Sequence, residues 1–462
     1  MMSGTTIDPS ALKSLKLDIE GSVVLPGDAH YDELRTPWLE VLEQHPAIIV
    51  EADCAEDVAA SVNFARDHGL SIGVMATGHG IAAPCDGLLL RFTKMNRIVV
   101  DTTRNVATIE AGVVSSELLK ATEKHGLVYP AGQAGNVGVV GYALGGGIGW
   151  LVRKLGAAVD HLVGADIVLA DGSFVRTNDS EHPDLFWALR GGGGNFGVVV
   201  SLDIALIPLK NVFGGELYYP LERAAELLRF YRTWSSQLSN DTSTIFRLVA
   251  VPPAPTSPKE IRGKTVCMIG LAHADPGSAD NLLAPLERLG APLHHDMKER
   301  SIASMAGLDP ASHMKHAPAY GQVEYLNELS DDVLDGLASL AHTKIPPLTQ
   351  FEIQQLGGAF RNKSLEGRGA FEPSSAPYLL HLESPAVKAS LAEIADATTE
   401  AFAALGDVYT GEKYYNFLRG DEQPNVGRAF GNTKFARLRQ IKAQYDPNNL
   451  FHVNLNIAPA EA

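Results

Sequence analysis

The sequence predicts an α+β protein with more than one domain, because its character changes at Pro208 and again near residue 412. Before Pro208, short apolar strands alternate with helices and with three glycine-rich turns. Between residues 209 and 412, amphipathic helices alternate with strands across proline-rich turns, which is typical of an antiparallel sheet with helices on one face. A chain of 462 residues is long enough for two or three domains.

The first region is predicted as an α/β unit followed by two hairpins. Its first helix is expected to begin at Asp53, where Glu56 three residues later suits a capping box, and to end at Gly69. Apolar runs predict strands at 22–25, 47–50, 71–75, 88–92 and 198–206. Hairpins are expected at 97–112 and around Asp171-Gly172, with helices at 116–125 and 185–190.

The second region alternates between the helix period and the strand period. Helices are expected at 222–238, 278–289, 330–342 and 385–404, and strands at 244–251, 265–272 and 350–356. Near the C-terminus we expect a helix at 430–445 and a last strand in the apolar run FHVNLNI at 451–457.

Charge and cysteine content exclude several classes of partner. With 38 Lys and Arg against 54 Asp and Glu, the formal net charge is −16, which repels nucleic-acid phosphates and anionic lipids. No run approaches the ~20 apolar residues of a spanning helix, and no signal peptide is evident. Cys54, Cys85 and Cys267 are odd in number and far apart, which fits a reducing compartment. We expect a soluble cytoplasmic protein that binds neither nucleic acid nor membrane.

Two short motifs resemble ligand sites but lack the necessary context. Gly192, Gly194 and Gly197 satisfy G-x-G-x-x-G, yet a helix precedes them and a strand follows, which is the reverse of a nicotinamide-dinucleotide site. The run at 294–296, His-His-Asp, is interpreted as a solvated turn, because adjacent side chains rarely converge on one ion. We therefore expect no metal site.

The best candidate for a ligand site is His79, which lies between Gly78 and Gly80 after an apolar strand. A lone histidine is more often a satisfied polar residue than a functional one. Further glycine-rich turns follow at 132–149 and 191–197, however, and one extended anion explains all three turns together. Backbone N–H groups in such turns bind anions without basic side chains. This pattern favours a dinucleotide held between strand ends.

Four segments identify a family resemblance that covers residues 20 to 457. They are ATGHGIAAPCDG from residue 76, GNVGVVGYALGGGIGWLVRKLG from 135, DLFWALRGGGGNFGVV from 184, and YYNF from 414 followed by AQYDPNNLFHVNLNI from 443. In this order and spacing the chain resembles the berberine bridge enzyme-like group of flavin-dependent oxidases, in the vanillyl-alcohol oxidase and p-cresol methylhydroxylase (PCMH) superfamily. The resemblance implies a two-domain FAD-binding PCMH-type fold, with an FAD-binding domain at 1–208 and 413–462 and a substrate (cap) domain at 209–412.

The resemblance also implies how FAD is held. His79 falls on the position that bonds covalently to the flavin 8α carbon, whereas Ala134 stands where many members carry a second, cysteinyl anchor. The family's arginine is replaced by Ala76-Thr77, so backbone N–H groups and the Thr77 hydroxyl would hold the pyrophosphate. The expected cofactor-binding residues are Ala76, Thr77, Gly78, His79, Gly80, Gly132, Asn136, Val137, Gly138, Gly141, Gly145, Gly197, Val199, Asn416, Asn454 and Asn456.

For catalysis, the resemblance implies that hydride passes from a CH–OH or CH–NH group of a small molecule to the flavin. Tyr414, in the family's Y-x-N motif, is the first candidate for the base, but a tyrosine needs its phenolate stabilised to act near neutral pH. Glu352 is the second candidate, because period-two spacing puts Gln350, Glu352 and Gln354 on one face of their strand. That face lines a pocket or, about equally, meets solvent.

The electron acceptor is expected to be dioxygen, with release of hydrogen peroxide. A dehydrogenase that uses another acceptor and a non-catalytic flavin-binding protein are the alternatives. Tyr320 and Tyr325 are further candidates for the pocket lining, against the alternative that they only pack in the core.

Overall fold

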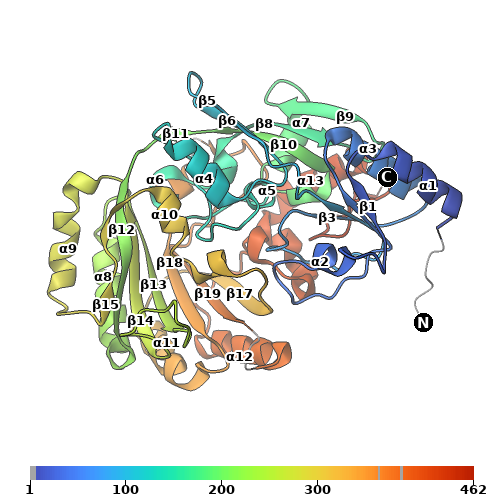
Figure 1. The fold of residues 1–462 in the computed structure, drawn as a ribbon. Helices are drawn as coiled ribbons and strands as arrows, with labels where there is room; N and C mark the ends of the chain where they lie inside the picture. Colours follow the sequence, from blue (N-terminus) through green and yellow to red (C-terminus); the bar gives the residue numbers. More distant parts are fainter. Residues whose placement is uncertain (1–6, 363–364, 386–388, 462) are drawn as a thin grey trace.

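A computed structural model describes residues 7–362, 365–385 and 389–461. Figure 1 shows the chain as two packed regions, with strands β12 to β19 on one side and the N-terminal strands together with helix α13 (Gly431–Tyr445) on the other. Mixed helices and sheets confirm the predicted α+β class. No helix in these ranges combines the length and the apolar character that a membrane crossing requires.

A four-stranded sheet comes first, in the order β1-β2-β4-β3. Strands β2 and β3 both run parallel to β4 between them, and helix α3 connects β2 to β3. The strands are β1 (Ser22–Val24), β2 (Ile48–Glu51), β3 (Ile72–Met75) and β4 (Leu88–Arg91). Val58, Val62 and Ala65 of α3 (Ala55–Asp67) are fully buried. The predicted α/β unit is therefore confirmed.

The start of helix α3 differs from the prediction. Cys54 is the N-cap residue, and no side chain caps the helix there. The carboxylate of Asp57 instead accepts the backbone N–H groups of Asp53, Glu20 and Gly21, at 2.7 to 3.0 Å. This buried carboxylate connects the helix to the segment before β1. The residue that accepts the backbone N–H groups is therefore Asp57, one position after the Glu56 that the capping pattern indicated.

An antiparallel five-stranded sheet follows, in the order β5-β6-β10-β8-β9. Both predicted hairpins occur in it, and Gly172 takes the positive φ of +82° that the second turn requires. Its strands are β5 (Ile98–Asp101), β6 (Val106–Glu110), β8 (Leu162–Val168), β9 (Phe174–Asn178) and β10 (Val198–Ala205). The helices of this region are α1 (Pro9–Asp18), α2 (Tyr31–Arg35), α4 (Ser115–Glu123), α5 (Val139–Leu144), α6 (Val152–Leu155) and α7 (Pro183–Leu189), and β7 (Leu127–Val128) pairs with β11 (Ile207–Pro208).

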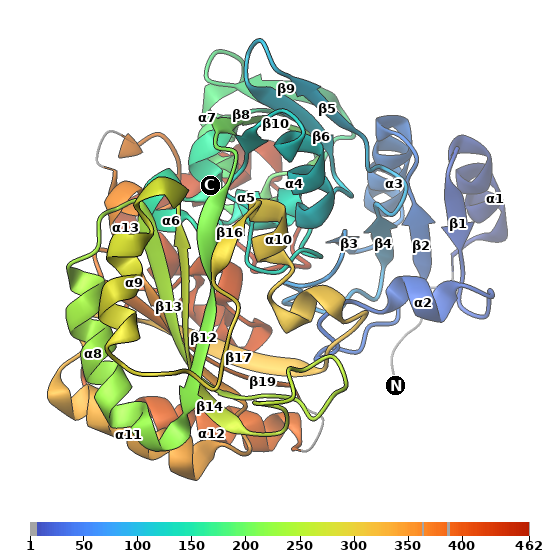
Figure 2. The same ribbon diagram turned by 60° about the vertical axis from the view of Figure 1, so that its left-hand side comes forward.

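The predicted antiparallel sheet of the second region is an eight-stranded one, in the order β15-β12-β14-β13-β18-β19-β17 with β16 beside β12. Figure 2 shows α8, α11 and α12 along its outer side. Their apolar residues pack with those of the sheet in one core, which holds Leu227, Leu337 and Ile394 at 0% exposure. The strands are β12 (Val212–Pro220), β13 (Thr242–Ala250), β14 (Thr265–His273), β15 (His294–His295), β16 (Lys298–Arg300), β17 (Ala319–Leu326), β18 (Gln350–Gln355) and β19 (Tyr378–Pro385). The helices are α8 (Ala224–Ser236), α9 (Asp280–Glu287), α10 (Ile302–Ala306), α11 (Asp331–Lys344) and α12 (Leu391–Ala404).

The run at 294–296 differs from its predicted conformation. His294 and His295 form the short strand β15 against β12 and not a solvated turn, because the edge of β12 that does not pair with β14 is free to pair with β15. No group of His, Cys, Asp and Glu that would hold a metal ion occurs in the part of the chain that the structure describes. The predicted helix at 385–404 includes 386–388, which lie outside the described residues.

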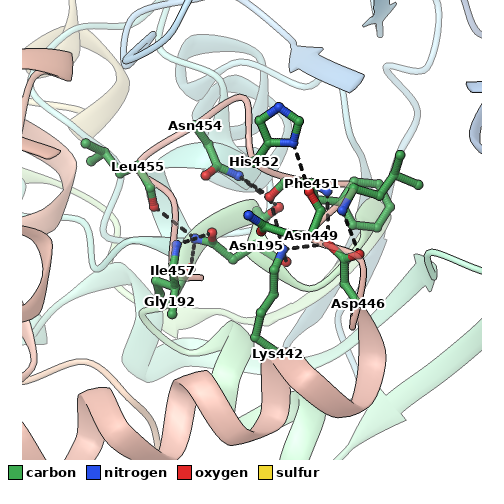
Figure 3. A network of polar contacts seen from close by, with 12 residues as sticks. Gly192, Asn195, Lys442, Asp446, Asn449, Phe451, His452, Asn454, Leu455 and Ile457 are labelled. Atoms are coloured by element: carbon green, nitrogen blue, oxygen red, sulfur yellow. Dashed lines mark hydrogen bonds and ion pairs between the residues drawn. The ribbon is translucent and has the colours of Figure 1, made fainter. Parts of the chain in front are cut away.

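The predicted last strand is wrong. Residues 451–457 form no strand, and a single parallel bridge joins Val453 to Gly73. Side chains hold this segment in place of a ladder, as Figure 3 shows: the buried Lys442 ammonium of α13 donates to the carbonyl oxygens of Asn195 (2.6 Å) and Phe451 (3.1 Å) and to the Asp446 carboxylate (2.6 Å).

Asn195 and Asp446 complete this network. The Asn195 amide donates to the Leu455 carbonyl at 3.2 Å and accepts the Ile457 N–H at 2.8 Å, while Asp446 accepts the N–H groups of Leu450 and Phe451. Buried backbone groups need such partners when no sheet supplies them. The network fixes the C-terminal segment against the glycine-rich turn at 191–197 (Figure 3).

Candidate functional site

A cavity of about 440 Å³ lies between the sheet of the second region and the glycine-rich turns of the first. Most of the predicted site residues line it: Ala76, Thr77, Gly78, His79, Gly80, Gly132, Val137, Gly138, Gly141, Gly197, Val199, Glu352, Tyr414, Asn416 and Asn454. Residues from near the start, the middle and the end of the chain thus meet at one place.

Three predicted residues do not line this cavity. Asn136 lies behind His79 and contacts it, and Gly145 packs so closely on Asn416 that a β carbon there would lie 1.8 Å from the amide oxygen. Asn456 bonds through its backbone to Gln423, because 451–457 does not alternate as a strand would. These two asparagines and this glycine are therefore not part of the cavity wall.

His79 is held on two sides in the loop after β3. Its ring stacks on Trp38 with 3.8 Å between ring centroids and 12° between planes, and its Nε2 lies 3.0 Å from Asn136 Oδ1. Burial lowers the pKa of His79 to about 4, so the imidazole is neutral at physiological pH. Gly78 has φ +82°, and a β carbon there would lie 2.5 Å from Pro37. The close approach that brings His79 to the cavity thus requires glycine before it.

The cysteine positions agree with a single candidate anchor. Ala134 lines the cavity and has no sulfur to offer. Cys85 also lines the cavity, but burial raises the pKa of its thiol to about 12, which keeps it protonated. Cys54 and Cys267 are absent from the lining.

The wall fits an extended dinucleotide. Gly193, Gly194 and Gly197 bring bare backbone to the cavity, and Gly197 has φ +154° with the Val168 carbonyl 2.6 Å from where a β carbon would stand. Helix α7 precedes this turn and β10 follows it, as the sequence indicated. Asn454 lines the cavity with a buried amide oxygen that has no partner among the described residues. Such backbone-rich turns and an unpaired amide suit FAD, whose phosphates and ring offer both acceptors and donors.

Tyr414 presents its hydroxyl oxygen to three donors. The oxygen accepts the backbone N–H groups of Gly147 (2.8 Å) and Ile148 (3.1 Å) and the side-chain amide of Asn416 (3.2 Å). Burial raises the pKa of Tyr414 to about 12, although these three hydrogen bonds act to lower it. The arrangement stabilises negative charge on the oxygen whenever its proton has left.

Glu352 lies on the cavity face of β18, as the alternation predicted. Gln350, Glu352 and Gln354 line the cavity, whereas Phe351 and Ile353 belong to the core under the helices. The alternative of a solvent-exposed face is therefore wrong.

An ion pair sets the charge of Glu352. Across the ladder, Arg247 of β13 donates from Nε to the Glu352 carboxylate. Burial alone would raise the pKa of Glu352, but the charge of Arg247 and the hydrogen bonds from Arg247 and Gln133 act against it, and the pKa is lowered. Glu352 is therefore ionised and accepts hydrogen bonds without donating one.

The sequence interpretation missed the polar partners around Glu352. Arg247 also donates to Gln133 Oε1 at 2.8 Å, and its nitrogens lie 3.8 Å from Glu216 and 3.6 Å from Asp309. The signal available in the sequence was a single arginine inside the apolar strand TSTIFRLVA, where a buried charge demands partners. The other missed lining residues with an acidic, histidine or arginine side chain are Asp309, His381, Glu383 and Arg419.

Neither tyrosine of β17 lines the cavity. Tyr325 is buried in the core, and the Tyr320 hydroxyl donates to Asp421 at 3.1 Å. Both side chains pack behind the wall, which was the alternative considered for them.

Two family models match the chain. One, described as FAD binding domain, matches residues 46–178, and the other, described as Berberine and berberine like, matches residues 413–458. The cavity wall draws on both segments, since His79 lies in the first and Asn416 and Asn454 lie in the second.

Individual relatives match over nearly the full length. (R)-6-hydroxynicotine oxidase of Paenarthrobacter nicotinovorans is 30% identical, covering 96% of this chain and 98% of that protein. Xylooligosaccharide oxidase of Thermothelomyces thermophilus is 25% identical over 92% and 90%. The crystal structure of 6-hydroxy-D-nicotine oxidase from Arthrobacter nicotinovorans superposes with a TM-score of 0.85 at 27% identity, covering 96% of this chain and 99% of that chain. The predicted two-domain FAD-binding fold is thus confirmed, and the chain belongs to the berberine bridge enzyme-like family of FAD-linked oxidoreductases.

Proposed function

We propose that this oxidoreductase is an oxidase: it removes a hydride from a CH–OH or CH–NH group of a small molecule and passes the electrons to dioxygen, with release of hydrogen peroxide. FAD is attached covalently through His79 alone. Residues 1–208 and 413–462 hold the cofactor, and residues 209–412 supply the roof over the substrate. The names of the relatives, which are oxidases of 6-hydroxynicotine and of xylooligosaccharides, support a small-molecule substrate.

The observation that carries the proposal is the composition of one cavity wall. It joins the His79 loop, the Tyr414 hydroxyl and the polar face of β18. Hydride removal from an alcohol or amine needs a bound hydride acceptor and a base for the heteroatom proton, and a carboxylate near them can orient the substrate.

Bound FAD would supply the two-electron acceptor, and the residues of this chain supply proton transfer and positioning. Tyr414 takes the proton of the substrate hydroxyl or amine at its phenolic oxygen, once its own proton has left. Gly147, Ile148 and Asn416 stabilise the charge on that oxygen through the three hydrogen bonds they donate to it. Glu352, kept ionised by Arg247, accepts a hydrogen bond from the substrate and orients it.

The anchor is tested by replacing His79. We expect wild-type protein to keep its yellow colour in an acid precipitate and to show an intact mass larger by one FAD. His79→Ala is expected to lose both, because no cysteine stands at position 134 to form a second bond. Wild type that releases all its flavin in acid contradicts the covalent attachment.

The carboxylate is tested by Glu352→Gln. We expect the second-order rate constant of flavin reduction to fall about tenfold, because the amide carries no charge and loses a hydrogen bond of charge-assisted strength. Glu324→Gln is the matched control, since Glu324 pairs with Lys413 at 2.6 Å but does not line the cavity. Anaerobic stopped-flow absorbance measures both variants, and an equal effect in the two would remove Glu352 from this role.

The identity of the electron acceptor is tested during turnover in air. An oxidase consumes one dioxygen and releases one hydrogen peroxide per substrate oxidised. A dehydrogenase would instead leave the reduced flavin stable in air until an artificial acceptor is added. Flavin that no alcohol, amine or sugar reduces would indicate a binding protein without turnover.

A further inference from the structure

One turn of the cap region holds both neighbours of the His79 ring. The turn comprises the short 3-10 helix Pro310–His313 and Met314 after it. Its backbone carbonyls bond to Asn136, which meets the edge of the ring, and to Trp38, which covers the face. The position of His79 in the first region therefore depends on a segment from the second.

The bonds to this turn fix which way the Asn136 amide points. Its Nδ2 donates to the carbonyl oxygens of Ala311 at 2.8 Å and Met314 at 3.2 Å. A flipped amide would place its oxygen against two carbonyl oxygens and lose both bonds. Oδ1 is therefore the atom 3.0 Å from His79 Nε2, and it can only accept a hydrogen bond.

An acceptor at Nε2 determines the tautomer of His79. The neutral imidazole carries its hydrogen on Nε2, which leaves the lone pair on Nδ1. Asn136 does not line the cavity, so the Nε2 edge faces away from it. Trp38 stacks on the ring, and its indole N–H donates to the Met314 carbonyl at 3.0 Å, so the ring plane is fixed as well.

We propose that Asn136 is a positioning residue that selects Nδ1 of His79 as the atom bonded to FAD, and that docking of the turn at 310–314 puts it in place. The inference rests on the proposed covalent attachment. The bond that forms joins Nδ1 to the 8α carbon, and the bond that breaks is a C–H bond of the 8-methyl group. The hydrogen of that C–H bond and the hydrogen of the imidazole N–H pass to the isoalloxazine together with two electrons. Dioxygen then removes them as hydrogen peroxide, which restores the oxidised cofactor.

The test compares the covalent linkage in wild type, Asn136→Leu and Asn136→Asp. The apoproteins are mixed with FAD in air, and the flavin retained after acid precipitation is followed over time. We expect Asn136→Leu to attach FAD about tenfold more slowly, as loss of one hydrogen bond predicts, and Asn136→Asp to recover part of the rate because it keeps an acceptor. Asn211→Leu is the matched control, because the Asn211 amide donates to Glu299 and does not line the cavity.

Nuclear magnetic resonance of the isolated flavinyl peptide identifies the bonded nitrogen. We expect Nδ1 only in wild type and a mixture of Nδ1 and Nε2 in Asn136→Leu. Wild type linked through Nε2, or an Asn136→Leu variant with wild-type rate and linkage, overturns this inference and leaves the anchor intact. Absence of any covalent flavin in wild type overturns the anchor itself. The double variant Asn136→Leu/His79→Ala is expected to bind FAD as tightly as His79→Ala by fluorescence quenching, which shows that slow attachment in Asn136→Leu does not reflect a misfolded cofactor site.

Discussion

Tyr414→Phe is expected to lower the rate constant of flavin reduction by about 100-fold or more, because the variant has no oxygen to accept the substrate proton. The removed hydroxyl also leaves the N–H groups of Gly147 and Ile148 without their acceptor. Anaerobic stopped-flow reduction measures the effect. Tyr320→Phe is the matched control, since its hydroxyl bonds to Asp421 outside the cavity. A rate within a few-fold of wild type would exclude Tyr414 as the base.

The pH profile separates proton transfer from a structural effect. Only the deprotonated phenol accepts a proton, and burial raises the pKa of Tyr414 to about 12. The reactive fraction therefore grows as pH rises, and in wild type we expect the logarithm of the reduction rate to climb with pH up to at least pH 10, without a plateau. Tyr414→Phe is expected to lose this slope. A plateau near pH 7 in wild type would assign the titrating group elsewhere.

Lys442→Met is expected to lower the free energy of unfolding by about 3 to 5 kcal/mol, because it leaves the buried Asp446 carboxylate without its counter-charge. Lys442 and Asp446 are both 0% exposed, and the ammonium also bonds two backbone carbonyl oxygens. Urea unfolding of the holoprotein measures the change.

The control for Lys442 is Lys344→Met, which breaks the ion pair with the exposed Glu400. Exposed pairs contribute about 0 to 1 kcal/mol, so this variant is expected to unfold near the wild-type midpoint. Equal changes in the free energy of unfolding would show that the network in Figure 3 stabilises the fold no more than an exposed ion pair does. We also expect Lys442→Met to bind FAD more weakly, since Asn454 and Leu455 of the cavity wall depend on the same network.

Local patterns predicted most of the elements and which residues of β18 share a face, but not whether that face lines a cavity or meets solvent. Alternation in β18 assigned Glu352 to one face and Phe351 to the other without any knowledge of the neighbouring strands. Glycine spacing likewise indicated the turns, because positive φ angles and close backbone approach are local requirements.

Contacts between segments that are distant in the sequence could not be predicted from local patterns. Arg247 meets Glu352, 105 residues later, only because β13 and β18 are paired in this register. The segment 451–457 has a strand-like pattern, yet Lys442 and Asn195 satisfy its backbone in place of a partner strand. Which polar side chain finds which partner depends on strand order, and strand order is a property of the whole chain.

The composition of the cavity wall also determines when, during translation, the cofactor site is complete. The His79 loop leaves the ribosome early, but Asn454 and Leu455, which line the same cavity, are translated more than 370 residues later. Until the segment after α13 has emerged, Asn195 of the glycine-rich turn at 191–197 lacks two of its partners, the Leu455 carbonyl and the Ile457 N–H. Nascent chains therefore present an incomplete cofactor site, and flavin uptake follows translation of this segment.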